Sequence, residues 1–339
     1  MKMIPQGSIR QCLEALAGEA RVYAPVKEDG LIVITEWKGQ DLAQGYINPE
    51  NTLKDVLYPQ TDTLLEFAGG YEDLTLKEPA PASPQVVFGT RPCDAAALEM
   101  NAQVFLGGEF TDENFRRRRD ATVVMSLACK EAGPYCFCRA MGGSPAGERG
   151  SDVMFYPKDG AYYVQALTGR GERVLAGLEG FTEEAPAGQG EDARAHCQET
   201  PVPWAEGLPV EGLQHKTEPL FDHPYWEELS HRCHSCGICT FVCPTCYCFA
   251  VFDAPRGTRG KRMRGWDACQ FKDFVLMAGG HNPRPTKKER VRQRFMHKLN
   301  YFVDTYGEYQ CAGCGRCVIK CPVGLHILGV ITGLEGVVS

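Results

Sequence analysis

The sequence predicts an α/β domain over residues 1–215 and a smaller, mostly helical, cysteine-rich domain over residues 216–339. Three observations support this division. Short apolar runs alternate with a helical pattern in the first part of the chain, as in parallel βαβ units. Proline, glycine, alanine and glutamate crowd residues 183–212, which is typical of a linker. Eleven of the 17 cysteines follow residue 216.

The elements of the first domain follow from apolar periodicity. We expect a helix over residues 8–20 and another that follows the segment 90–94 and runs through residue 105. We expect strands over residues 21–26, 31–37, 85–89, 121–127, 152–156 and 161–167. The strand–helix–strand order between residues 85 and 127 predicts a parallel pair. The last two strands flank Lys158-Asp159-Gly160, which predicts a hairpin.

Composition and charge limit the class of protein. With 339 residues and 43% hydrophobic residues, the chain can form a globular core in about two domains. A net charge of −7 disfavours a general nucleic-acid binder. The start of the chain has no apolar signal core, and no apolar run approaches the ~18 residues of a membrane helix. A high, odd cysteine count in a chain of this size indicates a reducing cytoplasm.

Two cysteine runs dominate the second domain. Residues 233–244 read CHSCGICTFVCP, and residues 311–322 read CAGCGRCVIKCP. Both follow the bacterial ferredoxin spacing, in which the fourth cysteine of each run ligates the other cluster. The sequence therefore predicts two [4Fe–4S] clusters. The first set of ligands is Cys233, Cys236, Cys239 and Cys321, and the second set is Cys311, Cys314, Cys317 and Cys243.

Zinc is the alternative for these cysteines. Zinc sites usually combine a Cys-x-x-Cys pair with a second pair more than a dozen residues away. A third cysteine at the same short spacing, then Cys-Pro, occurring twice, is poorly explained by zinc. We therefore expect the second domain to be a helical, ferredoxin-like 4Fe–4S dicluster domain. Because exposed cubane clusters are oxygen-sensitive, an anaerobic host is also expected.

Four cysteines of the first domain form a third set: Cys93, Cys129, Cys136 and Cys138. Cys93 and Cys129 each follow a predicted strand, and the carboxyl ends of parallel strands meet at one edge of a sheet. Cys136 and Cys138 come a few residues later. Convergence of the four thiols would form a third iron–sulfur cluster. Buried free thiols, which pack as small hydrophobes, and zinc stay open as alternatives.

A further group comprises Cys246, Cys248 and Cys269, called here the three-cysteine group. It could supply three ligands of another cluster, with the fourth ligand unidentified, or pack in the core beside the clusters. The spacing of Cys243 and Cys246 also occurs in dithiol sites, but Cys243 is needed for the second set. Cys12 and Cys197 are isolated and receive no role.

The 67 residues between the runs, 244–310, form a partly basic insert. Residues 256–298 contain 13 Lys and Arg against 3 Asp and Glu. Three interpretations are open: a solvated surface that offsets the charge of thiolate-ligated clusters, a docking face for an acidic redox partner, or a nucleic-acid patch. Within the second run, Arg316 and Lys320 either raise a cluster potential or are simply solvated.

Motifs for other chemistry are missing from the sequence. We find no dinucleotide fingerprint, P-loop or Gly-x-Ser-x-Gly, and no acid–base constellation, so no catalytic residue is predicted. One-electron transfer needs none of these. The sequence therefore predicts electron transfer rather than hydride chemistry.

Several segments resemble one family of iron–sulfur proteins. They are CHSCGICTFVCPTCYCFAVF (233–252), TRPCD (90–94), YCFC (135–138), GWDACQF (265–271) and AGGHNPRPTKK (278–288). The chain thus resembles, over residues 85–326, the β subunit of sulfhydrogenases, as well as the iron–sulfur subunit of the anaerobic sulfite reductase. That resemblance implies electron relay between a catalytic subunit, either a nickel–iron hydrogenase or a sirohaem sulfite reductase, and a flavoprotein subunit that binds FAD and NAD(P). It also favours metal binding by the third set and the three-cysteine group.

The sequence thus predicts a cytoplasmic iron–sulfur electron-transfer subunit of a multi-subunit oxidoreductase, with two clusters and a third expected. Two rival hypotheses are a self-contained redox enzyme with a cofactor in its first domain, and an iron–sulfur nucleic-acid binder that uses residues 256–298.

Overall fold

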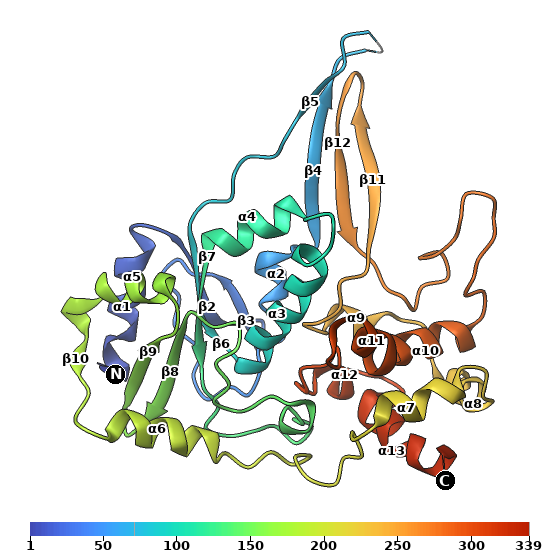
Figure 1. Ribbon diagram of the computed structural model, residues 1–339. Coiled ribbons are helices and arrows are strands. Elements are labelled where there is room, and N and C mark those ends of the chain that lie inside the picture. Colours follow the sequence, from blue (N-terminus) through green and yellow to red (C-terminus); the bar gives the residue numbers. More distant parts are fainter. Residues whose placement is uncertain (71, 339) are drawn as a thin grey trace.

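A mixed eight-stranded sheet forms the N-terminal body of the computed structural model, which describes residues 1–70 and 72–338 (Figure 1). The strand order is β10-β1-β9-β8-β7-β6-β2-β3. The strands are β1 (Lys2–Pro5), β2 (Arg21–Glu28), β3 (Leu31–Glu36), β6 (Gln85–Thr90), β7 (Thr122–Leu127), β8 (Val153–Lys158), β9 (Ala161–Ala166) and β10 (Glu183–Glu184). The four central strands β2, β6, β7 and β8 are parallel, and their neighbours on both sides are antiparallel.

Helices cover both faces of this sheet because successive side chains of a strand point to opposite faces. Val86 and Phe88 of β6 join the core that includes α1, whereas Val87 joins the core that includes α3. The helices of this body are α1 (Ile9–Ala17), α3 (Pro92–Leu106), α4 (Glu113–Ala121), α5 (Gly169–Ala176) and α6 (Gln189–Gln198). Parallel pairing of β6 with β7 across α3 confirms the predicted βαβ unit, and the β8–β9 hairpin is confirmed too.

The prediction of a linker at residues 183–212 was wrong in part. This segment contains β10 and α6, and α6 packs on the hairpin with Ala193 and Cys197 fully buried. The sequence of α6 does not predict a helix, because it is rich in glycine and charged residues and too few of its residues are apolar to show a periodic face.

A second sheet, the arm, projects from the body (Figure 1). Its order is β11-β12-β4-β5, with β4 (Thr61–Ala68), β5 (Thr75–Lys77), β11 (Phe249–Arg256) and β12 (Arg259–Trp266). The short helix α2 (Lys54–Leu57) precedes β4. The sheet therefore joins strands from either side of residue 215. Buried Arg264 anchors it through ion pairs with Asp62 (2.8 Å) and Asp112.

The C-terminal part is helical and has its own core. It contains α7 (Leu213–Thr217), α8 (Tyr225–Arg232), α9 (Ile238–Phe241), α10 (Lys287–Met296), the π-helical turn η5 (His297–Tyr301), α11 (Phe302–Tyr306), α12 (Arg316–Ile319) and α13 (Ile327–Val338). Trp226, Phe295 and Leu299 lie at the centre of this core. Short 3₁₀ turns occur at Gln6–Ser8, Arg139–Met141, Glu179–Phe181 and Glu218–Leu220. None of the helices in the described residues is long and apolar enough to cross a membrane.

Candidate metal centres

The four cysteines of the first set line one cavity. Cys233, Cys236 and Cys239 come from the first run, and Cys321 comes from the second. Gly237, the N-cap of α9, has a φ of 74° and packs so closely that an added Cβ would meet the Phe271 ring at 2.7 Å. The glycine therefore allows the loop to curl around the cavity. Cys236 is exposed, so this cavity lies near the surface.

The second set lies deeper in the molecule. Burial raises the pKa of Cys311, Cys314 and Cys317, and the charge of Cys243 raises it further in each case. Cys243 is thus a close neighbour of all three, as the crossed ferredoxin arrangement requires. Because burial favours the neutral thiols, binding of iron would release their protons.

The third set also converges. Cys129 lies close enough to Cys93, Cys136 and Cys138 for ionisation of one thiol to raise the pKa of another. Burial raises the pKa of Cys138 to about 12, and the charges of Cys129 and Cys136 contribute to this rise. Cys93 follows β6 and Cys129 follows β7, so both come from the carboxyl ends of neighbouring parallel strands.

The loops of the second and third sets are in direct contact. The N–H of Phe137 donates to the carbonyl oxygen of Gly313 (2.9 Å). Gly313 has a φ of 63°, and a Cβ there would lie 2.5 Å from the backbone nitrogen of Cys138. Only glycine fits this position without displacing the neighbouring cysteine loop.

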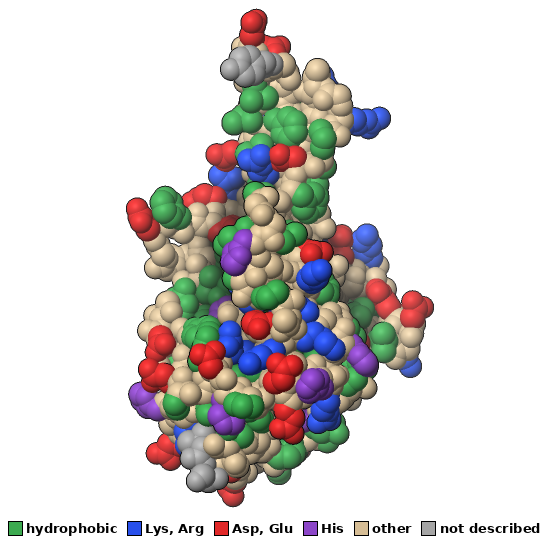
Figure 2. Space-filling view, turned by 90° about the vertical axis from the view of Figure 1, so that its right-hand side faces the viewer, with side chains coloured by type: hydrophobic (Ala, Val, Ile, Leu, Met, Phe, Trp, Pro, Cys, Tyr) green, Lys and Arg blue, Asp and Glu red, His purple; other side chains and the backbone are tan. Residues whose placement is uncertain are grey.

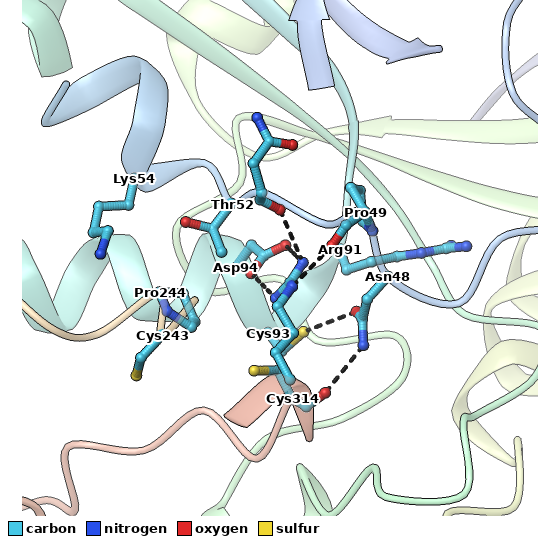
Figure 3. Close-up of polar contacts among 12 residues, drawn as sticks. Asn48, Pro49, Thr52, Lys54, Arg91, Cys93, Asp94, Cys243, Pro244 and Cys314 are labelled. Carbon is cyan, nitrogen blue, oxygen red and sulfur yellow. Dashed lines mark hydrogen bonds and ion pairs between the residues drawn. The ribbon is translucent and has the colours of Figure 1, made fainter. Parts of the chain in front are cut away.

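Polar side chains bridge the same two sets (Figure 3). The Asn48 amide donates to the Cys314 carbonyl oxygen (3.0 Å), and its oxygen lies 3.8 Å from the Cys93 sulfur. Arg316 forms a bidentate ion pair with Asp94 at 2.7 and 2.8 Å. Both partners of this pair are buried, so Arg316 is a component of the interior rather than a solvated charge.

Comparison with known proteins identifies the family and a dicluster domain in the C-terminal part. A family model described as a 4Fe-4S dicluster domain matches residues 232–325. The chain is 30% identical over 247 residues to sulfhydrogenase 2 subunit beta of Pyrococcus furiosus, which covers 73% of this chain and 72% of that relative. The chain belongs to the sulfhydrogenase β-subunit family of iron–sulfur proteins. No solved structure matches it. The family resemblance predicted from the motifs is thus confirmed, as is an α/β fold with a C-terminal 4Fe–4S dicluster domain.

In this family member, two buried cations lie among the cysteines. Lys298 donates to the Cys243 sulfur (3.4 Å), to the Thr245 hydroxyl and to the Gln310 carbonyl oxygen. Burial lowers the pKa of Lys298, but the charges of Cys243 and Cys246 act in the opposite direction and the net shift is upward. Lys298 belongs to the π-helical turn, a feature that is frequent at functional sites.

Arg294, one turn earlier, lies between the first and second sets. Its guanidinium donates to the Cys239 carbonyl oxygen (2.7 Å) and to the Cys246 sulfur (3.6 Å). The charge of Cys317 from the second set also acts on it. Sequence analysis missed both cations because lysine and arginine are rarely fully buried.

The basic insert does not form one basic face. Four of its cations are buried: Arg264, Arg290, Arg294 and Lys298. Three others form ion pairs with carboxylates: Lys261, Arg262 and Arg292. Figure 2 shows acidic and basic side chains intermixed on the face that includes the arm. Many of the cations in residues 256–298 are therefore buried or paired with carboxylates, and two of the buried ones lie beside the cysteines.

The three-cysteine group stays together at the root of the arm. Cys248 and Cys269 act on each other's pKa, as do Cys246 and Cys243, so the members of each pair lie close together. The neighbouring Cys248 thiol lowers the pKa of Cys269 to about 5. Cys12 and Cys197 lie in separate hydrophobic cores.

Within residues 1–70 and 72–338, no three His, Cys, Asp or Glu side chains form a group that could hold a single metal ion. Ligands of a four-iron cube bind separate corners of the cube and lie farther apart than ligands of one ion. The crossed first and second sets and the thiol chemistry of their donors therefore fit [4Fe–4S] clusters.

Proposed function

We propose that this chain is the iron–sulfur electron-transfer subunit of a multi-subunit oxidoreductase of the hydrogenase type. Its partners are a catalytic subunit, which is a nickel–iron hydrogenase or a sulfite reductase, and a flavoprotein subunit that binds NAD(P). The observation that carries this proposal is the contact between cysteine sets. The first and second sets exchange their fourth cysteines, and the third set packs directly on the second.

Each set has a proposed role in holding a cofactor. Cys233, Cys236, Cys239 and Cys321 hold one [4Fe–4S] cluster, and Cys311, Cys314, Cys317 and Cys243 hold the other, in a ferredoxin-like domain at residues 216–339 that is helical apart from the β11–β12 hairpin. Cys93, Cys129, Cys136 and Cys138 hold a third iron–sulfur cluster in the α/β domain at residues 1–215. When bound, such clusters supply one-electron transfer without acid–base catalysis. The reducing cytoplasm is the proposed location.

The surrounding side chains support this use. Lys298, Arg294 and Arg316 are buried cations beside the cysteines, and they offset the negative charge of thiolate ligands. The hydrogen bonds of Lys298 to the Cys243 sulfur and of Arg294 to the Cys239 carbonyl oxygen also orient these loops. Three of the four cysteines of the second set are buried, which limits access of water, whereas the exposed Cys236 brings the first set near the surface, where a partner can approach.

Anaerobic reconstitution with partner subunits tests this proposal. The isolated chain is expected to lack NAD(P)H oxidation at enzymatic rates, although dithionite reduces its clusters. Addition of the flavoprotein partner should allow NAD(P)H to produce the same reduced-cluster EPR signals. Stoichiometric flavin in the isolated chain, or NAD(P)H-driven reduction of an acceptor by that chain alone, would establish a self-contained enzyme instead.

A further inference from the structure

The loop between β12 and α10 lies against the first cysteine set, and Figure 1 shows it standing out beside α10. Phe271, directly before this 272–286 loop, packs on Phe241 of the first run with ring centroids 6.1 Å apart. Lys287, directly after it, donates to the Cys233 carbonyl oxygen (3.2 Å). Both ends of the loop are thus fixed to the run that contains three of the first-set cysteines.

Polar groups of the loop itself hold its shape. The Asn282 side chain donates to the Lys272 carbonyl oxygen (2.7 Å) and accepts from the Arg284 N–H (2.9 Å). The Met277 N–H donates to the His281 carbonyl oxygen (2.9 Å). A surface loop closed by its own contacts keeps a defined outline, so a partner can bind it at a low cost in conformational entropy.

The loop and the start of α10 contain cations without carboxylate partners. The cations of residues 256–298 that are neither buried nor ion-paired are Arg256, Arg259, Lys272, Arg284, Lys287 and Lys288. The first two lie in and beside the β11–β12 turn of the arm. In the described residues, the other four form no ion pair, whereas the nearby Arg292 and Lys320 do. The only acidic residue in the stretch 272–288 is Asp273, so this stretch is basic.

A further cation borders the first set from the other side of the first run. Arg232 donates to the Val323 carbonyl oxygen (3.1 Å), two residues after Cys321, and it forms no ion pair in the part of the chain that the structure describes. Arg232 and Lys287 therefore each bind a loop that holds first-set cysteines. Cys236 of the same set is exposed, so unpaired positive charge surrounds the set where it reaches the surface.

Apolar side chains are exposed on the same loop. Leu276 is 51% exposed and Met277 is 56% exposed. A single exposed apolar residue is ordinary, but an adjacent pair in a loop with unpaired cations has the composition of an interface, which combines apolar contact with a polar rim.

The extent of this surface favours a transient partner with an acidic face. Permanent subunit interfaces are large and apolar, whereas electron-transfer encounters bury little surface and depend on charge. Two exposed apolar side chains and five unpaired cations match the second kind. A nucleic acid would also supply negative charge, but it has no use for a neighbouring redox centre.

We propose that the 272–286 loop, with Arg232 and Lys287, is the docking site of a small acidic one-electron carrier protein, of the flavodoxin or ferredoxin kind, that exchanges electrons with the first set. This inference rests on the proposed function, because it requires a cluster in the first set. It extends that function by a route that does not pass through the flavoprotein subunit. The carrier loses one electron and the chain gains one, without any bond being formed or broken.

Binding of an acidic bacterial flavodoxin to the anaerobically purified full chain tests this inference, with an acidic ferredoxin as the second probe. Isothermal titration calorimetry should show a dissociation constant that rises about tenfold between about 0.05 and about 0.3 M NaCl, because salt screens the docking charges. Fully reduced flavodoxin, freed of excess reductant, should lose one electron per molecule to the chain, followed by the flavin absorbance.

Charge reversals locate the docking site. Lys272→Glu and Lys287→Glu should each raise the dissociation constant about tenfold. The matched control is Arg259→Glu, which makes the same change in charge at an exposed, unpaired cation of the arm and should change the constant less than about twofold. Lys272 makes no side-chain hydrogen bond to the cysteine runs in the described residues, so its variant separates docking from the integrity of the first set.

The inference is wrong if neither carrier binds, or if Lys272→Glu and Arg259→Glu weaken binding equally. Oligonucleotide binding at physiological ionic strength that Lys272→Glu abolishes would make the loop a nucleic-acid surface instead. Self-association that the same variant abolishes would assign the loop to a second copy of this chain. All these results leave the dithionite-reduced EPR signals of the first and second sets in place, and their absence from the wild-type chain would refute the proposed function.

Discussion

Replacing Lys298 with methionine removes one buried positive charge beside the second cysteine set. Methionine has a similar length and apolar character, so packing against the helical core is retained. The lost ammonium lies 3.4 Å from the Cys243 sulfur. Because the cation stabilises the more negative, reduced state of a cluster held there, we expect the substitution to lower that cluster's reduction potential.

The size of the shift follows from Coulomb's law. The electron added on reduction spreads over the cluster, so its effective separation from the ammonium is about 7 Å. With an effective dielectric constant of about 20, the interaction is about 2 kcal/mol. For a one-electron couple, about 1.4 kcal/mol corresponds to about 59 mV. The predicted decrease is therefore about 80 mV.

Potentiometric titration followed by low-temperature EPR measures this shift in the anaerobically purified chain. Lys320→Met is the matched control. Lys320 lies in the second run but is 39% exposed at its side chain and pairs with Glu50 at 2.6 Å. Water screens such a charge, so its removal should change the potentials much less. Equal shifts in the two variants, or none in Lys298→Met, would refute the role assigned to the buried cation.

Three further predictions concern stability, measured as the free energy of unfolding in urea under anaerobic conditions. Gly313→Ala should be more destabilising than Gly307→Ala by about 2 kcal/mol, because both glycines have a positive φ but only Gly313 packs against the neighbouring cysteine loop; equal losses would contradict this. Asp94→Asn should cost about 3 kcal/mol by leaving Arg316 buried without its carboxylate, and an unchanged urea midpoint would show that the pair is dispensable. Burial lowers the pKa of His297 from 6.5 to about 4, so the unfolded chain binds more protons than the folded chain between these values. The free energy of unfolding should therefore fall by about 2 kcal/mol from pH 7 to pH 5 on account of this group, and His297→Gln should remove that part of the slope; identical slopes would exclude the histidine as its source.

The cysteine spacings and strand ends predicted much of the candidate site. Ligand spacing in the two runs is local, so it can be read without knowing the fold. The sequence could predict that Cys93 and Cys129 lie near each other, because the carboxyl ends of parallel strands lie at the same edge of a sheet. Both predictions need only short stretches of sequence, so they do not require knowledge of the tertiary structure.

The arm and the buried cations could not be predicted in the same way. β4 pairs with β12 across about 200 residues, as in the pair of Thr61 with Gly265, and nothing in either segment specifies its distant partner. Lys298 and Arg294 occur in a basic stretch that resembles a solvated surface. Their burial follows from tertiary contacts with the cysteines, which the helix sequence alone does not contain.

The metal and sulfide content of the anaerobically purified full chain, read together with low-temperature EPR, tests the central claim most directly. If the two runs exchange their fourth cysteines around a pair of cubane clusters, the chain contains at least about eight irons and eight acid-labile sulfides. Its dithionite-reduced EPR spectrum should then show two interacting [4Fe–4S]⁺ centres. A chain without iron, or with zinc bound by the first and second sets, would contradict the account.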